Sequence, residues 1–156
     1  MQEKTCCFIG HRTINATEEL KRKLTETIEK LITEEKVDIF LFGSKSEFNT
    51  LCLELVTALK EKYPDIKRVY IRAEYPVIDE TYKTYLLNSY EDTYFPEKLI
   101  GAGKAVYIER NLEMIDKSRF CVFYYNYNKT PSARKSGTKI ALDYAKKQNK
   151  KVLPFN

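Results

Sequence analysis

The sequence predicts an α/β protein in which helices cover both faces of an open, mainly parallel sheet. Short apolar runs of strand length alternate with segments whose apolar residues recur at helical spacing. That order is typical of parallel strands joined by crossover helices. The 156 residues contain no repeat and no interdomain linker, which fits one domain over residues 1–156.

The expected elements follow one another with little gap. Strands are expected at 5–9, 37–42, 67–73, 104–107, 119–125 and 150–154. The first helix should start at a capping box formed by Asn15 and Glu18, and its apolar stripe runs to Ile32. Further helices are expected over 48–59, 79–88, 109–117 and 137–148, with a long loop through 91–103 and a polar loop at 126–136.

Composition narrows the class of protein. No apolar run approaches the roughly 20 residues of a membrane span, so no membrane partner is expected. Strand 5–9 follows Met-Gln-Glu-Lys too closely for a signal peptide, so we expect a cytoplasmic protein. The net charge of +5 favours anionic partners without identifying one. All four cysteines lie in apolar runs, so we expect them to be buried thiols. Because the chain has only one histidine, no metal site is predicted.

Three glycines stand at element ends: Gly10 after the first strand, Gly43 after the second, and Gly137 before the last helix. In an open parallel sheet such ends meet at one edge, where ligands bind. Glycine lets the backbone approach a ligand, and a helix N-terminus attracts anions. Arg12 could pair with a phosphate in bidentate fashion. Hydroxyl donors are available at Ser44, Ser46, Ser136 and Thr138.

Other side chains leave alternatives open. His11, the only histidine, either contacts a ligand or caps its loop. No G-x-G-x-x-G and no Walker pattern is present. The tyrosines could stack on a nucleobase or fill the core or a subunit interface; they are Tyr75, Tyr82, Tyr85, Tyr90, Tyr94, Tyr124, Tyr125 and Tyr127.

Motifs in a fixed order along the chain resemble a known group. They are "FIGHR" at 8–12, "FGSKSEFN" at 42–49, "DTYFPE" at 92–97, "ERNLEMID" at 109–116 and "SGTKIALDYAKKQNKKV" at 136–152. Together they resemble the SLOG superfamily, in its branch of small stand-alone bacterial YpsA-like proteins. The resemblance runs from about residue 4 to 154.

The resemblance implies a Rossmann-like fold that binds nucleotides or nucleotide-derived ligands. The superfamily includes LOG-type phosphoribohydrolases, the DNA-uptake protein DprA, and sensor domains for NAD-derived signals. Many members are dimers, so a homodimer or higher homo-oligomer is implied. Combined with the glycine turns, it predicts ligand binding by Gly10, His11, Arg12, Gly43, Ser44, Arg110, Asn111, Ser136, Gly137 and Thr138.

Departures from the LOG pattern argue against its hydrolytic chemistry. LOG enzymes carry Gly-Gly-x-Gly-Thr-x-x-Glu, whereas Ala141 stands at the glutamate position here and Arg134-Lys135-Ser136 replace the leading glycines. Alanine cannot act as a base or stabilise an oxocarbenium-like centre. The second loop, which tends to end in Gly-x-Phe-Asp, reads Glu47-Phe48-Asn49 and loses its acidic group.

We therefore expect a protein that senses or sequesters a nucleotide-derived molecule, of the ADP-ribose, NAD or cyclic nucleotide type. No catalytic residue and no cofactor are predicted. One alternative is a hydrolase of a nucleotide or N-glycosidic bond, using Glu109, Asp116 or a carboxylate of 74–97. Another is DprA-like nucleic-acid binding through the lysines of 146–151, with affinity that falls steeply with salt.

Overall fold

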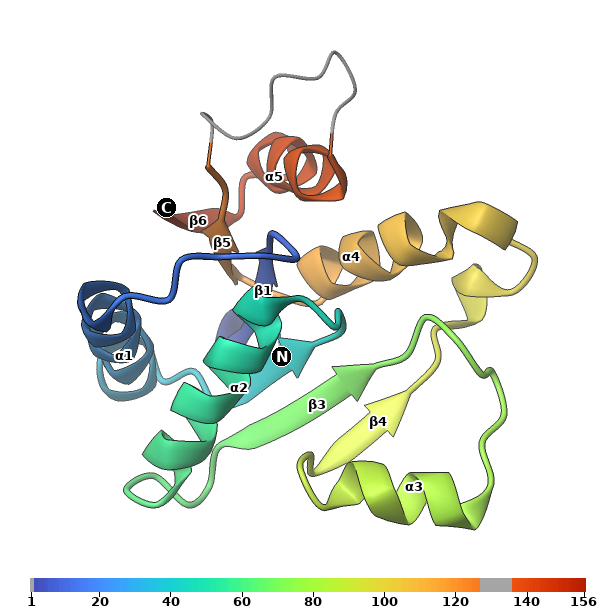
Figure 1. The fold of residues 1–156 in the computed structure, drawn as a ribbon, viewed down its shortest axis with the longest axis horizontal. Coiled ribbons are helices and arrows are strands. Elements are labelled where there is room, and N and C mark those ends of the chain that lie inside the picture. The colour runs from blue at the N-terminus through green and yellow to red at the C-terminus, as the bar shows by residue number, and fades with distance from the viewer. Residues whose placement is uncertain (1, 127–135) are drawn as a thin grey trace.

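The predicted α/β architecture is confirmed by a computed structural model, which describes residues 2–126 and 136–156. All described strands form one parallel sheet in the order β4-β3-β2-β1-β5-β6 (Figure 1). Their bounds are β1 (Thr5–Gly10), β2 (Ile39–Phe42), β3 (Lys67–Ile71), β4 (Asp92–Tyr94), β5 (Phe120–Tyr124) and β6 (Lys151–Phe155). The open sheet with crossover helices is Rossmann-like.

The helices divide between the two faces of the sheet. They are α1 (Glu18–Thr33), α2 (Glu47–Lys60), α3 (Glu80–Leu87), α4 (Val106–Asp116) and α5 (Gly137–Lys147), with short 3-10 turns at Gln2–Lys4, Glu97–Leu99 and Gly103–Ala105. Helices α1 and α2 pack on the face that carries Cys6 and Phe8. Helices α4 and α5 pack on the face that carries Cys7 and Ile9. Because successive side chains of a strand point to opposite faces of the sheet, the strands contribute to two hydrophobic cores.

The chain changes direction once across the sheet. It runs outward from β1 to the edge strand β4, and then returns to the other side of β1 to form β5 and β6. Helices that follow β1 and β2 therefore cover one face, and those that follow β4 and β5 cover the other. A crevice opens beyond the carboxyl ends of the strands where the order reverses, here between β1 and β5.

Three local predictions are wrong. The N-cap of α1 is Thr17, whose hydroxyl accepts from Leu20 N at 3.0 Å, and not Asn15. Glu18 is then the first helical residue, where its charge favours the helix dipole but closes no capping box. The strand expected at 104–107 is a 3-10 turn that leads into α4. The loop expected through 91–103 contains edge strand β4, too short and too polar for an alternating pattern.

The loop expected at 126–136 lies mostly outside the described residues, as do Tyr127, Arg134 and Lys135. Within the described ranges, no helix is both long and apolar enough to cross a membrane.

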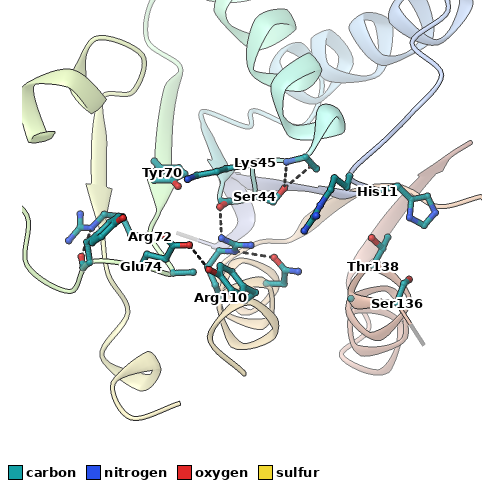
Figure 2. A pocket seen from close by; sticks show the side chains of 18 of the residues that line it. His11, Ser44, Lys45, Tyr70, Arg72, Glu74, Arg110, Ser136 and Thr138 are labelled. Atoms are coloured by element: carbon teal, nitrogen blue, oxygen red, sulfur yellow. Dashed lines mark hydrogen bonds between the residues drawn. The ribbon is translucent and has the colours of Figure 1, made fainter. Parts of the chain in front are cut away.

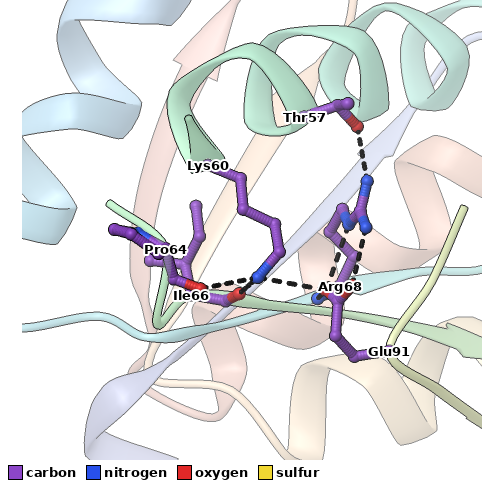
Figure 3. Close-up of polar contacts among 6 residues, drawn as sticks. All are labelled: Thr57, Lys60, Pro64, Ile66, Arg68 and Glu91. Carbon is purple, nitrogen blue, oxygen red and sulfur yellow. Dashed lines mark hydrogen bonds and ion pairs between the residues drawn. The ribbon is translucent and has the colours of Figure 1, made fainter. Parts of the chain in front are cut away.

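A cluster of charged residues, Lys60, Arg68 and Glu91, holds β3 in place at the edge of the sheet opposite the crevice (Figure 3). Glu91 accepts from Arg68 N at 2.8 Å, and Arg68 Nη2 lies 2.6 Å from its other oxygen. Lys60 Nζ donates to Pro64 O at 2.7 Å and to Ile66 O at 2.6 Å, and lies 3.9 Å from Glu91. This cluster joins the end of α2 to β3 and to the residues that lead into β4.

We predict that Glu91→Gln lowers the free energy of unfolding at neutral pH by about 1–2 kcal/mol, because a bidentate, partly buried ion pair is lost. Burial alone would raise the pKa of Glu91, but the hydrogen bonds and charge of Arg68 outweigh it and lower the pKa. A lowered folded-state pKa gives stability above the unfolded value that is lost as pH falls. The deficit of the variant should therefore shrink in acid. Urea unfolding at about pH 7 and pH 3 measures it.

The exposed Glu61, at the end of the same helix, supplies the control Glu61→Gln, which should change stability little at either pH. A deficit of Glu91→Gln that is the same at both pH values would contradict the ion-pair explanation.

Candidate functional site

All of the predicted ligand-binding residues line one pocket at the carboxyl edge of the sheet. The cavity measures about 660 Å³, within the range of sites for small molecules. Figure 2 shows Ser136 and Thr138 of α5 on one side, Arg110 of α4 in the middle, and Arg72 and Glu74 beyond β3 on the other side. The cavity spans the point where the strand order reverses.

The loop after β1 is anchored at both sides of this pocket. Glu47, the first residue of α2, donates its N–H to Arg12 O at 2.8 Å and accepts from Ile14 N at 3.0 Å. His11 Nε2 accepts from Asn126 N at 2.9 Å, so the histidine joins this loop to the end of β5. The Arg12 side chain is exposed on the pocket, and no hydrogen bond or ion pair joins it to a described residue.

Two of the glycines line the pocket and also allow close packing behind it. A Cβ on Gly10 would lie 2.6 Å from Phe48 Cγ, and a Cβ on Gly43 would lie 2.7 Å from Met114 Sδ. Real Cβ contacts this short do not occur, so these positions bring β1 close to α2 and β2 close to α4. Of these three glycines, Gly137 alone has open space where its Cβ would be, which leaves room for a ligand at the start of this helix.

The turn after β2 is held by an asparagine. Asn49, 3% exposed, accepts from Gly43 N at 3.1 Å and donates its amide to Phe8 O at 3.0 Å. This buried position needs a side chain with both a donor and an acceptor. Asparagine provides both, whereas an ionised aspartate provides only acceptors. Ser46 caps α2 by accepting from Asn49 N, and its hydroxyl shares a hydrogen bond of 2.7 Å with Ser44.

Arg110 is the most deeply placed cation in the pocket, at 5% exposure. It donates Nη1 to Gly43 O and Nε to Asn111 Oδ1, the latter at 3.2 Å. No ion pair neutralises it among the described residues, and burial lowers its pKa. No buried side-chain nitrogen in the described ranges lacks a hydrogen-bond partner, so its unbonded Nη2 must open into the cavity.

Helix α5 starts on the side of the pocket opposite β3. Ser136 is its N-cap and accepts from Lys139 N at 3.1 Å, while Gly137 and Thr138 form the first turn. Gly137 and Thr138 line the pocket, and no hydrogen bond to a described residue engages the backbone N–H of either. Ala141 lies one turn further on at 1% exposure, packed in the core with Cys7 and Met114. It does not line the pocket.

The sequence did not indicate the side of the pocket that is formed by β3 and the residues after it. This side includes Tyr70, Arg72 and Glu74, and the pocket is also lined by Lys45 and Tyr107. Arg72 and Glu74 follow β3 in "YIRAE", a strand end without a glycine turn. The signal that could have found them is an apolar run that ends in two charged residues. Without the strand order, nothing placed this run beside the first two strands.

Some of the tyrosines predicted either to stack on a base or to fill the core line the pocket, and the other described ones do not. Tyr75 and Tyr82 line the pocket and contact each other edge to face, with ring centroids 5.9 Å apart. Tyr90 packs on Phe42 and Tyr70 in the core, and burial raises its pKa to about 12. Other tyrosines away from the pocket are Tyr85, exposed on α3, Tyr94, hydrogen-bonded to Glu113, and the buried Tyr124 and Tyr125. Stacking on a base stays a prediction for the two that line it.

The remaining candidates for chemistry lie elsewhere. Cys6, Cys7, Cys52 and Cys121 are all buried, and burial raises the pKa of Cys6 and of Cys52. Asp116 accepts from Tyr144 Oη at 2.6 Å and pairs with Lys98 at 3.5 Å, outside the pocket. Glu109 does not line it either. The described lining contains one carboxylate, Glu74.

Comparison with known proteins does not assign a family to the chain. No family model matches it, and a search of curated proteins finds no match. Function therefore has to be inferred from the chemistry of the pocket.

Proposed function

We propose that the protein binds a phosphorylated nucleotide-derived molecule, of the ADP-ribose, NAD or cyclic nucleotide type, and senses or sequesters it. The observation that carries the proposal is the excess of positive charge in one pocket. Arg12, Lys45, Arg72 and Arg110 line the cavity, and Glu74 is the single carboxylate among its described lining residues. None of these four cations makes an ion pair with a described residue.

The two helix starts add to this positive potential. The N-termini of α2 and α5 each contribute a partial charge of about +0.5, and α5 adds the unbonded N–H groups of Gly137 and Thr138. A phosphate between them would meet hydroxyls at Ser44, Ser136 and Thr138 and the exposed guanidinium of Arg12. Tyrosine faces along the β3 side suit a sugar or a base. The resemblance of the pocket motifs to SLOG proteins supports the same class of ligand.

We predict that Arg12→Ala weakens binding about tenfold or more, since a charge-assisted contact to phosphate is lost. Its exposed side chain makes no hydrogen bond or ion pair with a described residue, so the free energy of unfolding should change by less than about 0.5 kcal/mol. Calorimetric titration with ADP-ribose, cyclic ADP-ribose isomers, NAD and cyclic dinucleotides measures affinity, and urea unfolding measures stability.

Lys146→Ala is the matched control, because it removes one charge at the far end of α5. It should bind the ligand as the native protein does. No binding by the native protein across the panel would contradict the proposal. Salt-sensitive DNA binding that Lys146→Ala weakens would instead favour the DprA-like alternative.

Hydrolysis of a nucleotide or N-glycosidic bond is a second candidate function, favoured by the position of Glu74. Of the carboxylates considered from the sequence, only Glu74 lines the cavity. It could act as the general base for an attacking water. Chromatography of ADP-ribose incubated with the protein tests this: turnover that Glu74→Gln abolishes would support it, and unchanged ligand would exclude it for that substrate.

A further inference from the structure

The β3 wall of the pocket presents its one carboxylate in a fixed position. Arg72, only 8% exposed, donates Nε to Tyr75 O at 3.2 Å and Nη1 to Thr93 Oγ1 at 3.1 Å. The loop from Arg72 to Tyr75 is thus wrapped around a buried guanidinium. Tyr75 adopts a left-handed backbone with φ of 60°, which is rare for a non-glycine residue. Such strain is typical of a loop whose conformation serves a site.

Glu74 lies at the centre of this loop and is held from across the pocket. Tyr107 of α4 donates its hydroxyl to Glu74 Oε1. The Tyr107 ring also lies 5.8 Å from the guanidinium of Arg110. Burial lowers the pKa of Arg110 and the charge of Glu74 offsets only part of this, and the two form no ion pair. The second oxygen, Oε2, bonds to no described residue.

The charges of the pocket are therefore unequal at its two ends. Among the described lining residues, Ser136, Thr138 and the start of α5 form an end without a carboxylate, whereas Glu74 adds a negative charge near Arg72 at the β3 end (Figure 2). A phosphate at the β3 end would be repelled by Glu74 and would leave its free oxygen without a donor. A ligand group that donates O–H or N–H bonds would satisfy it.

We propose that Glu74 determines specificity by accepting hydrogen bonds from the neutral end of the ligand, a ribose hydroxyl pair or a base amino group, while the phosphates bind at the α2 and α5 helix starts. The inference rests on the proposed function and adds the orientation of the ligand. Tyr107 positions the carboxylate, and Tyr75 and Tyr82 supply faces beside it. Simple polyphosphates are then poor ligands because they have no donor for Glu74.

The test compares Glu74→Gln with the native protein by calorimetry, using ADP-ribose and pyrophosphate as probes. The amide keeps an acceptor for Tyr107 but loses the charge and one acceptor oxygen. We expect the ratio of the ADP-ribose affinity to the pyrophosphate affinity to fall about tenfold, the value of a charge-assisted hydrogen bond. Tyr107→Phe should give a smaller fall in the same ratio. Glu109→Gln, which changes the same charge outside the pocket, should leave the ratio unchanged.

Two analogues identify the donor. If the effect of Glu74→Gln disappears with the deoxyribose analogue of ADP-ribose, the donor is a sugar hydroxyl; if it disappears with the hypoxanthine analogue, the donor is the base amine. A native protein that binds both probes but shows an equal change for both in the variant would overturn the role of Glu74 alone. If the native protein does not bind ADP-ribose, the panel member that it does bind takes its place in this comparison, and a native protein that binds no member of the panel would overturn the proposed function.

Discussion

Replacing Asn49 with aspartate is expected to lower the free energy of unfolding by about 3 kcal/mol at neutral pH. The native amide donates to Phe8 O at 3.0 Å while its oxygen accepts from Gly43 N at 3.1 Å. A carboxylate keeps the second bond but sets an anionic oxygen against the Phe8 carbonyl at 3% exposure. Both a lost buried hydrogen bond and an unpaired buried charge oppose folding.

The deficit should depend on pH with a definite sign. Burial beside a carbonyl raises the folded-state pKa of the introduced carboxyl above its unfolded value of about 3.9. A raised folded-state pKa gives stability at low pH that is lost as pH rises through it. Asn49→Asp should therefore approach native stability in acid and fall away toward neutral pH. Urea unfolding across about pH 4 to 8 measures this.

Asn15→Asp is the matched control, because Asn15 is exposed and makes no cap. Its stability should stay within about 0.5 kcal/mol of the native protein. If Asn49→Asp were as stable as this control at neutral pH, the amide would not be the link between the ends of β1 and β2.

Replacing Arg110 with methionine is expected to weaken ligand binding at least about 100-fold, near 2.7 kcal/mol. Among the described lining residues its guanidinium is the most buried cation, and its Nη2 makes no hydrogen bond to them. In a cavity of lowered dielectric, contacts from such a group to phosphate are worth more than those of an exposed arginine.

Stability should change much less than binding. Methionine removes a buried charge that has no ionic partner, which favours folding, but it leaves Gly43 O without a donor. These effects oppose each other, so we expect a net change below about 2 kcal/mol. Calorimetry and urea unfolding on one preparation separate them. Arg119→Met, at the far end of β5, is the control and should bind normally. Binding by Arg110→Met within a few-fold of native would contradict the assignment.

Much of the fold could be predicted because the buried strands and amphipathic helices are strongly patterned. The fully buried β5 and the stripe of α1 are examples. Edge strand β4 was missed because its three residues, Asp-Thr-Tyr, are partly exposed and carry no apolar alternation. The α1 cap was misplaced because Asn15 and Thr17 are both good capping residues, and the choice depends on tertiary contacts of the loop.

The candidate site was predicted where motifs mark it, at Gly10, Gly43 and Gly137, and these do meet at one pocket. The sequence did not show that Gly10 also makes room for Phe48, and Gly43 for Arg110 and Met114. Which chain segment fills that space depends on packing that the sequence does not encode locally. The β3 wall with Glu74 needed the strand order, which places β3 next to β2.

The most direct test of the central claim is to identify what the pocket retains. The native protein and a variant with Arg12→Ala and Lys45→Ala are incubated with a nucleotide library, washed and denatured, and the released molecules are identified by mass spectrometry. Both replaced side chains are exposed on the cavity, so the variant should remain folded. We predict one intact phosphorylated, nucleotide-derived species from the native protein and little of it from the variant. Release of no such species from the native protein, or equal release from both, would contradict the proposed site.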